Sequence, residues 1–357
     1  MSVVLLSWGG AGHYKINTAS GLSFNAEKAQ FNTWITTLAD HASDADERKA
    51  WDTNEGPKHY IDIDNYDEFL TQGWIPQTLD SVIAIHGSSF VYGNGILPWA
   101  TIAAFDSLES CFERLDWAKA VLFASDLGHY VADGHMPLHI TRNYNGQYTG
   151  NTGIHSRYES TMINTYISQI TYEGYEISEI NDVNQYIFNY LYTNYVYVDS
   201  VIAADDYAKG LAGNTTSSTY KQALWDTSKS FTIPLFKNAS HALTELIYTA
   251  WVQAGSPLIS PDFIYSSNHE NVISLEQNAP NPFRTSTRIN YHLISNSHII
   301  LQVYDLNGLF IATLVDDQKT KGDYYVDWNP ENISAGTYNL ILKTGNSVDF
   351  KKMILLD

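Results

Sequence analysis

The stretch His129-Tyr-Val-Ala-Asp133-Gly-His-Met-Pro-Leu-His139 brings several metal-binding residue types together in a short space. His129 and Asp133 are four residues apart, so on a helix their side chains lie on the same face. A second pair with this spacing, His155 and Glu159, follows within about thirty residues. Histidine nitrogen and carboxylate oxygen are ligands that Zn²⁺ accepts. The two pairs, joined by His139, therefore predict a metal centre carried by helices.

Further candidate ligands lie upstream of this stretch, and they are Trp8, His13, Asp46 and His59. Asp46 and His59 fall in a loop region, and we expect them to reach the helix that carries His129 and Asp133. Asp46 and His59 would then join His129 and Asp133 in one site with two nitrogen and two oxygen ligands. Asp46 is also a candidate general base for a bound water.

The remaining metal-binding side chains of the stretch form a smaller group, made of His139, His155 and Glu159. Three protein ligands leave positions open for water, which is typical of catalytic rather than structural zinc. His13 and a free amine at Trp8 still need a carboxylate partner, and Asp133 can supply it as a bridge between two ions. The expected centre thus has three parts.

Composition limits the classes of protein to which the chain can belong. It has 357 residues and a net charge of −19, from 20 basic and 39 acidic side chains, whereas binding to duplex DNA needs a basic surface. Cys111 is the only cysteine, which excludes an intrachain disulfide and a zinc finger. No run of residues is long enough to span a bilayer. Residues 1–7 are interpreted as the remnant of a signal peptide, so that cleavage after Ser7 would leave Trp8 first; a buried N-terminal strand is the alternative.

Hydrophobic periodicity predicts an all-α domain over residues 8–255. Its expected helices cover Ala26–Asp40, Trp99–Leu115, Asp116–Asp133, His155–Ile170, Glu179–Ala204, Ser217–Ser230 and Ile233–Ala254. Residues 55–98 are rich in Gly, Pro and Tyr and are expected to form long structured loops, where binding residues tend to lie.

The pattern changes to short alternating strands after a linker at residues 256–270. The expected strands are Thr287–Leu293, Ile299–Tyr304, Phe310–Leu314, Tyr324–Trp328, Gly336–Lys343 and Val348–Leu355. Turn sequences such as Asn307-Gly308 separate them. Residues 271–357 are therefore expected to fold as a small all-β, immunoglobulin-like sandwich.

This C-terminal module resembles the sorting domain of the type IX secretion system. The motifs that carry the resemblance are Asn278-Ala-Pro-Asn-Pro-Phe283, Val303-Tyr-Asp-Leu-Asn-Gly308, Gly322 with Trp328, Ser334-Ala-Gly-Thr-Tyr338 and Lys351-Lys-Met-Ile-Leu-Leu356. The resemblance implies export by that machinery across a bacterial outer membrane, followed by release or attachment to the cell surface.

Residues 8–160 resemble the superfamily of zinc-dependent phospholipases C and single-strand-specific zinc nucleases. The matching motifs are Trp8-Gly-Gly-Ala-Gly-His13, Ala42-Ser-Asp-Ala-Asp46, His59-Tyr-Ile-Asp62, His129-Tyr-Val-Ala-Asp133, Met136-Pro-Leu-His139 and His155-Ser-Arg-Tyr-Glu159. The resemblance implies three zinc ions in an all-helical domain, held by three sets of ligands. These sets are Asp46, His59, His129 and Asp133 for one ion; His139, His155 and Glu159 for another; and the amine and carbonyl of Trp8 with His13 and bridging Asp133 for the third.

A metal cluster of this kind suits hydrolysis of a phosphodiester by a metal-activated water, with Asp46 as general base and Asp62 or Asp64 as weaker candidates. The gap of 16 residues between His139 and His155, the acid Glu159 and the single cysteine all favour a phospholipase C over a nuclease. A single-strand-specific nuclease stays the first alternative, and a surface binding protein with structural metals is the second.

The residues that bind the substrate are left unassigned by the sequence. Tyr60, Tyr66, Trp74 and Tyr92 can line a pocket for a quaternary ammonium group or stack on bases, but they can equally be loop core. Arg157 can contact phosphate or point to solvent. The protein is expected to be monomeric and to meet a phospholipid or nucleic-acid substrate outside the cell.

Overall fold

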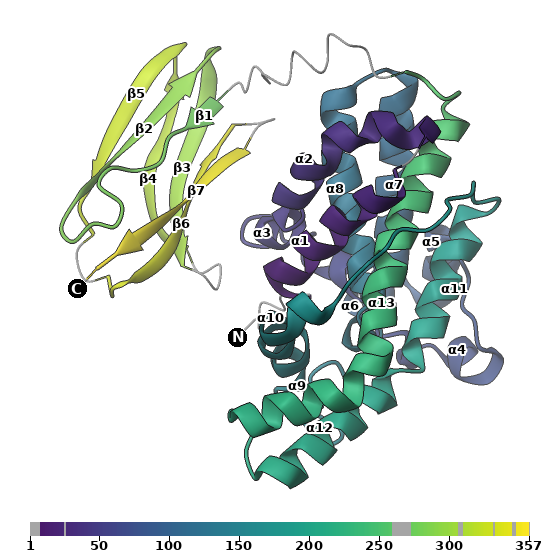
Figure 1. Ribbon diagram of the computed structural model, residues 1–357. Coiled ribbons are helices and arrows are strands. Elements are labelled where there is room, and N and C mark those ends of the chain that lie inside the picture. The colour runs from purple at the N-terminus through teal and green to yellow at the C-terminus, as the bar shows by residue number, and fades with distance from the viewer. Residues whose placement is uncertain are drawn as a thin grey trace. The chain divides into compact units, whose positions relative to one another are not determined.

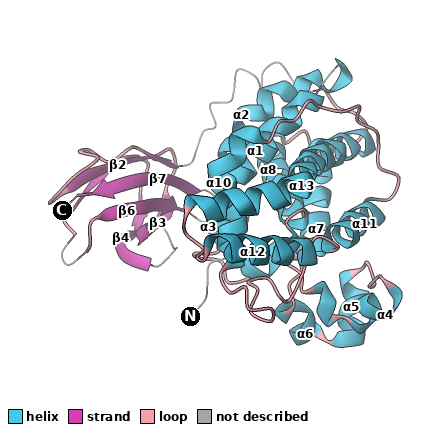
Figure 2. Ribbon diagram, turned by 60° about the horizontal axis from the view of Figure 1, so that its bottom comes forward, coloured by secondary structure: helices cyan, strands magenta, loops and turns pink. Residues whose placement is uncertain are grey.

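A computed structural model describes residues 8–24, 26–258, 273–305, 310–330, 333–344 and 348–356 (Figure 1). The chain divides near residue 264 into two compact units, one helical and one built of strands (Figure 2). The prediction of an all-α domain followed by a small β-sandwich is thereby confirmed. The expected signal-peptide remnant at residues 1–7 and most of the expected linker lie outside the described residues.

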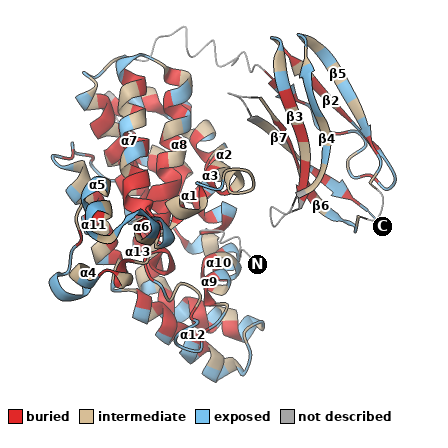
Figure 3. Ribbon diagram, turned by 180° about the vertical axis from the view of Figure 1, so that it is seen from behind, coloured by how far each residue is buried: buried red, intermediate tan, exposed pale blue. Residues whose placement is uncertain are grey.

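The centre of the helical unit is a bundle of long helices that surround a continuous apolar core. These helices are α1 (Gly9–Ser20), α7 (Leu97–Glu113), α8 (Trp117–Gly134) and α13 (Ser218–Gln253), and they run side by side in Figure 1. Asp116 caps the N-terminus of α8 by accepting a hydrogen bond from the backbone of Lys119. Every residue of α8 from Leu127 onward is buried, which Figure 3 shows in red. Polar groups on that last stretch therefore lie inside the protein rather than at its surface.

Residues 55–98, which the sequence analysis expected to be loops, form a series of short helices instead. They are η3 (Gly56–His59), η4 (Ile63–Asn65), α4 (Asp67–Gln72), α5 (Leu79–His86) and α6 (Ser88–Gly93). Glycines such as Gly73 and Gly87 adopt positive φ angles and end the turns, so no single helical period develops. Upstream, α1 was not predicted, and the expected helix Ala26–Asp40 begins as the 3₁₀ segment η2 (Ala26–Trp34) before α2 (Ile35–Asp40). The acidic turn α3 (Asp44–Arg48) follows.

Two predicted helices, His155–Ile170 and Glu179–Ala204, are broken in the structure. The first is divided into α9 (Ile154–Ser156), the π-helical turn η6 (Arg157–Met162), α10 (Ile163–Tyr166) and η7 (Ile167–Gln169). The second is divided into α11 (Val183–Tyr195) and α12 (Val198–Ala212). The buried amide of Asn194 donates a hydrogen bond to the carbonyl of Gly134 at the end of α8, which ties the end of α11 to that helix.

Conversely, the two helices predicted as Ser217–Ser230 and Ile233–Ala254 are one continuous helix, α13, which contains Pro234. Proline removes a backbone hydrogen bond and usually interrupts a helix. Buried side chains on both sides of it, including Trp225 and Phe236, pack into the same core. This burial outweighs the local cost of the proline.

Among the described residues, the second unit has two antiparallel sheets. One has the order β1 (Ile273–Leu275), β2 (Thr287–Leu293), β5 (Gly322–Trp328), and the other has the order β4 (Phe310–Lys319), β3 (Ser297–Asp305), β6 (Gly336–Lys343), β7 (Val348–Leu355). Alternate residues of β2 are buried, as expected for a sheet with one face on the core. The short strand β1 was missed, because three residues do not make a recognisable period. No helix in the described part of the chain is long and apolar enough to cross a membrane.

Candidate metal centre

The predicted ligands converge in the interior of the helical unit although they come from seven different elements. His13 lies on α1, Asp46 on α3, His59 at the end of η3, His129 and Asp133 on α8, His139 on η5 (Pro137–His139), His155 on α9 and Glu159 in the π-helical turn η6. All eight of these side chains belong to residues between 0% and 7% exposed. Their ligand atoms gather into three groups, which are His13, His129 and Asp133; Asp46, His59 and His129; and His139, His155 and Glu159.

The group around His129 has the spacing of ligands that share one ion. The Nδ1 atom of His59 lies 3.0 Å from Nε2 of His129 and 3.5 Å from Oδ1 of Asp46. The distance from Nε2 of His129 to Oδ1 of Asp46 is 3.6 Å. Two ligands bound at about 2.0–2.1 Å to a tetrahedral zinc ion lie roughly 3.3 Å apart. The three atoms therefore fit around one zinc ion with little movement.

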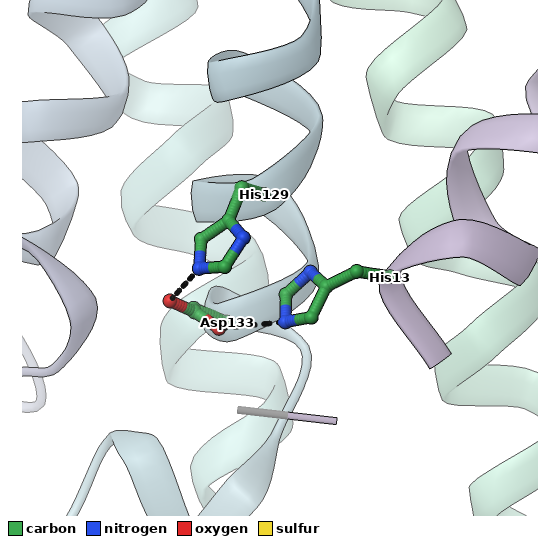
Figure 4. A group of neighbouring side chains, drawn as sticks. All are labelled: His13, His129 and Asp133. Carbon is green, nitrogen blue, oxygen red and sulfur yellow. Dashed lines mark ion pairs between the residues drawn. The ribbon is translucent and has the colours of Figure 1, made fainter. Parts of the chain in front are cut away.

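Asp133 lies between this group and a second one, with its two oxygen atoms facing different partners. Its Oδ2 atom is 3.0 Å from Nδ1 of His59 and 3.4 Å from Nε2 of His129. Its Oδ1 atom is 3.5 Å from Nε2 of His13, and Figure 4 shows Asp133 between the imidazoles of His13 and His129. These two imidazoles are stacked, with their centroids 3.9 Å apart. One carboxylate thus has the geometry to bridge two ions.

The third group is separate and equally compact. The Nε2 atoms of His139 and His155 are 3.2 Å apart, and Oε2 of Glu159 is 3.5 Å and 3.0 Å from them respectively. The π-helical turn η6 keeps Glu159 on the same side as His155 even though the segment is not a regular α-helix. Wide turns of this kind occur frequently at functional sites.

Backbone carbonyls determine which nitrogen each imidazole presents to the centre. The Nδ1 atoms of His129, His139 and His155 lie 2.7, 2.6 and 3.0 Å from the carbonyl oxygens of Ala42, His59 and Tyr144. A carbonyl can only accept, so each Nδ1 must carry a proton and each neutral ring keeps the lone pair of Nε2 for a metal. In the third group, two such lone pairs face one another at 3.2 Å, an arrangement that a shared cation would stabilise.

The electrostatics of the buried acids also suit metal ligands. Burial alone would raise the pKa of Asp46, but the nearby charges of Lys49, His129 and His59 lower it to about 2. Burial likewise opposes ionisation of Asp133, yet His129 and His139 hold its pKa well below the usual value. Oδ2 of Asp46, Oδ1 of Asp133 and Oε2 of Glu159 have no hydrogen-bond donor within the described structure. Buried carboxylate oxygens without donors are costly, and cations at these positions would satisfy them.

The pKa values of the buried histidines are shifted in different directions. Burial and the neighbouring His129 lower the pKa of His13 to about 3, despite the opposing charges of Asp133 and Asp46. Burial also disfavours the charged form of His129, but Asp133 and Asp46 outweigh it and raise its pKa to about 9. The carboxylates of Asp133 and Asp46 thus create a negative potential at His129.

The side chain of Trp8 packs against α8. Its ring is fully buried against Tyr158 and Phe236, and its Nε1–H donates a hydrogen bond of 2.8 Å to the carbonyl of Ala132, the residue before Asp133. The carbonyl of Trp8 accepts from the backbone of Gly12 at 3.2 Å and so starts α1. The role of its amine as a ligand stays a prediction, because it depends on cleavage before Trp8.

The structure shows which of the candidate acidic residues lie outside the three ligand groups. Asp44, the acid two positions before Asp46, is another candidate by sequence, but it pairs with His41 at 2.7 Å. The buried carboxylate of Asp64 accepts hydrogen bonds from the hydroxyl of Thr141 and the backbone of Arg142, and so anchors a loop. Neither acid belongs to the three ligand groups formed by the described residues.

Some of the candidate substrate-binding residues have structural partners or are buried, and others are exposed. Arg157 forms a bidentate ion pair with the buried carboxylate of Asp205, at 3.0 Å to each oxygen, which gives it a structural partner. Tyr66 is fully buried and belongs to the core, whereas Trp74 and Tyr92 are 49% and 44% exposed. Tyr60 is partly exposed, and its hydroxyl donates to the carbonyl of Gly93 at 3.4 Å. Trp74 and Tyr92 are thus the most exposed of the four candidate rings.

Two residues near the centre were missed by sequence reasoning. The ammonium group of Lys49 donates to Oδ1 of Asp46 at 2.5 Å, and Oε1 of the buried Glu55 lies 3.5 Å from Nε2 of His59. Their spacings to the metal-binding residues, three and four positions, were a usable signal. Similar spacings also occur between exposed charges on ordinary helices, so burial was needed to distinguish these pairs.

Comparisons with known proteins support the C-terminal assignment most directly. Residues 279–356 match the family of the secretion system C-terminal sorting domain. The prediction of a sorting module is confirmed, and the protein is one destined for secretion or for attachment at the cell surface. The match covers β2 to β7 and leaves the helical unit unassigned.

For the whole chain, similar solved structures include two clostridial toxins. The alpha toxin of Clostridium absonum has a TM-score of 0.45 at 9% identity, and the alpha toxin from an avian strain of Clostridium perfringens has a TM-score of 0.44 at 12% identity. Each comparison covers 96% of this chain and 96% of the toxin chain. Similarity at this level does not assign an activity. No curated protein matches the sequence.

Proposed function

We propose that the helical unit is a zinc-dependent phosphodiester hydrolase and that its substrate is a phospholipid, which it cleaves as a phospholipase C does. The observation that carries this proposal is the convergence of buried ligand atoms into three groups, in which the imidazoles of His129, His139 and His155 are fixed by backbone carbonyls. Such fixed second contacts are typical of metal-binding histidines.

Three zinc ions are the proposed cofactors. One would be held by Asp46, His59, His129 and Asp133, the second by His139, His155 and Glu159, and the third by His13, bridging Asp133 and the amine and carbonyl of Trp8. When bound, the ions would acidify a water molecule and neutralise the negative charge of a phosphoryl group.

The remaining chemistry belongs to side chains of the chain itself. Asp46 is the proposed general base, because Oδ2 has no hydrogen-bond donor within the described structure while Oδ1 faces the ligand group. Lys49 is held beside this carboxylate at 2.5 Å and adds a positive charge close to the place where the phosphate would bind. The group of His139, His155 and Glu159 offers three ligands, so a bound ion would keep a coordination position for water or substrate. An open position is typical of catalytic rather than structural zinc.

The charge of the protein favours a lipid with a neutral or zwitterionic headgroup over a polyanion. The net charge is −19, and residues 61–96, which follow His59, contain five acidic residues and no lysine or arginine. Trp74 and Tyr92 lie in the same segment and are exposed, so they can make cation–π contacts with a quaternary ammonium group. Single-stranded nucleic acid is the second candidate, since bases can stack on the same two rings.

One preparation can test both the chemistry and the substrate. The full chain, processed before Trp8 and loaded with zinc, is assayed side by side on phosphatidylcholine and on single-stranded DNA, and its metal content is measured. We expect about three zinc ions per chain, loss of activity with a chelator, and faster cleavage of the lipid. A protein that binds no zinc, or whose activity survives the chelator, would refute the proposed hydrolase; faster cleavage of DNA would favour the nuclease.

A further inference from the structure

His59 differs from the three carbonyl-bound histidines in the nitrogen that it presents to the centre. His129, His139 and His155 direct Nε2 inward, because Nδ1 is bound to a backbone carbonyl. In His59 the inward atom is Nδ1, which lies 3.0 Å from both Oδ2 of Asp133 and Nε2 of His129. To bind a metal through Nδ1, the neutral ring must carry its proton on Nε2.

The group that faces Nε2 of His59 is a carboxylate rather than a carbonyl. Oε1 of Glu55 lies 3.5 Å from this nitrogen, at the outer limit of a hydrogen bond. Glu55 is fully buried and precedes His59 by four residues, the spacing of one helical turn. Nε2 makes no hydrogen bond of ordinary geometry in the described structure, and Oε1 of Glu55 is the acceptor that faces it, so this contact is the available means of holding the proton there.

Glu55 is itself fixed by groups outside the three ligand groups. It accepts a hydrogen bond of 2.5 Å from the hydroxyl of Tyr130 and one of 2.7 Å from the ammonium group of Lys58. Arg48 adds a contact of 3.4 Å to Oε2 and also pairs with Asp126 at 2.9 Å. The carboxylate therefore stays in place behind His59, because three buried or half-buried side chains on three segments of the chain hold it.

We propose that Glu55 is a positioning residue that keeps the proton of His59 on Nε2 and so directs Nδ1 to the metal. Carboxylate–histidine–metal arrangements of this kind orient the ring and raise its basicity, and loss of the outer partner typically weakens metal binding by about 10–100-fold. The inference rests on the proposed metal centre, and it adds to it a residue that determines how one ligand binds.

The first test is spectroscopic and needs no variant. In the full chain labelled with ¹⁵N-histidine and loaded with zinc, the ring nitrogens of His59 are assigned, with a His59→Gln sample to identify its signals. We expect Nδ1 of His59 to be bound to metal and Nε2 to carry a proton, whereas His129, His139 and His155 show the opposite pattern. Metal bound to Nε2 of His59 would overturn the proposal.

The second test measures zinc affinity by competition with a chelator. Glu55→Ala should lower the affinity for one zinc ion by about 10–100-fold and leave the affinity for the others unchanged. Glu55→Gln keeps an acceptor oxygen and should recover part of the lost affinity. Lys58→Met is the matched control: it removes a partner of Glu55 on the side away from His59, and its zinc affinity should stay within about twofold of wild type.

The outcomes separate this inference from the proposed function. If the wild-type chain binds no zinc, the hydrolase proposal fails. If it binds zinc and Glu55→Ala binds it equally well, only the role of Glu55 is overturned. If Glu55→Ala loses all ions together with its helical circular dichroism, Glu55 supports the fold rather than the ligand, and the positioning role is overturned as well.

Discussion

The helical unit and the β unit use the same kinds of charged pair in opposite ways. In the β unit, His292 lies 2.5 Å from Asp323, closer than His155 lies to Glu159 in the helical unit. Yet the side chains of His292 and Asp323 are 42% and 90% exposed, whereas those of His155 and Glu159 are 4% and 2% exposed. An exposed pair is solvated and contributes little, but buried groups that converge with further ligands must be satisfied inside the protein. A short distance between a histidine and an acid therefore indicates a site only when burial accompanies it.

Removal of one histidine from each unit should give the largest contrast. His129 takes part in two ligand groups, so we expect His129→Ala to lower zinc affinity and turnover by more than about 100-fold, since even outer partners of a metal matter by 10–100-fold. His292→Ala should change neither quantity. Metal analysis and turnover on the preferred substrate measure the effect, while the thermal transition of the β unit serves as a folding control. Full turnover in His129→Ala would contradict the proposed centre.

A second contrast concerns two bidentate pairs between arginine and aspartate. Asp205 is fully buried and accepts hydrogen bonds from Arg157, Tyr220 and the amide of Asn151. Arg288 and Asp327, by contrast, form an exposed pair with contacts of 2.7 and 2.8 Å. Asp205→Asn should lower the free energy of unfolding by about 3 kcal/mol, because it leaves a buried guanidinium without its counter-charge. Asp327→Asn should cause no resolvable change in chemical denaturation.

The effect of Asp205→Asn should also depend on pH. Burial alone would raise the pKa of Asp205, but hydrogen bonds from Tyr220, Asn151, Lys209 and Arg157 lower it below the usual value. The stabilisation is therefore present above the unfolded pKa near 4 and is lost as the pH falls through the folded pKa. An unchanged difference between wild type and variant down to pH 2 would show that the ion pair is not its source.

Asp62 should make folding stability depend on pH in the opposite direction, and the effect should be smaller. Burial, followed by the charge of Asp64, raises the pKa of Asp62 to about 7, although Arg142 opposes this. The protonated form is favoured in the folded state, so stability is fully present below about pH 4 and is lost as the pH rises to 7. The free energy of unfolding of Asp62→Asn should equal that of wild type at pH 4. At pH 8 it should be higher by on the order of 2 kcal/mol, after allowance for partial solvent screening. Denaturation with urea at the two pH values tests this.

The smallest expected effect concerns exposed aromatic rings. Trp74→Ala should raise KM for phosphatidylcholine by about two- to fivefold and leave stability unchanged, since cation–π contacts at exposed sites contribute about 0.5–1 kcal/mol. Tyr325→Ala provides the control in the β unit, where Tyr325 is 62% exposed. Equal KM values for Trp74→Ala and wild type would exclude this ring from headgroup binding.

Much of the architecture was predictable because it follows from local patterns. The boundaries of α7 and α8 were predicted to within a few residues from their periodicity. The strands of the β unit followed from alternation and turn residues. The failures occurred where tertiary contacts override local preference, as at Pro234, which lies inside α13, and in residues 157–162, where a π-helical turn replaces the expected α-helix.

The sequence by itself determined which residues are able to bind metal and that His129 and Asp133 share a helix face, because spacing on a helix is a local property. Only the tertiary structure decided that side chains as distant in the chain as His13 and Glu159 lie within one buried region, and that Asp133 faces two groups. It also decided that His59 presents Nδ1 with Glu55 behind it. These features depend on how separate helices pack against one another, and no local period in the sequence records that packing.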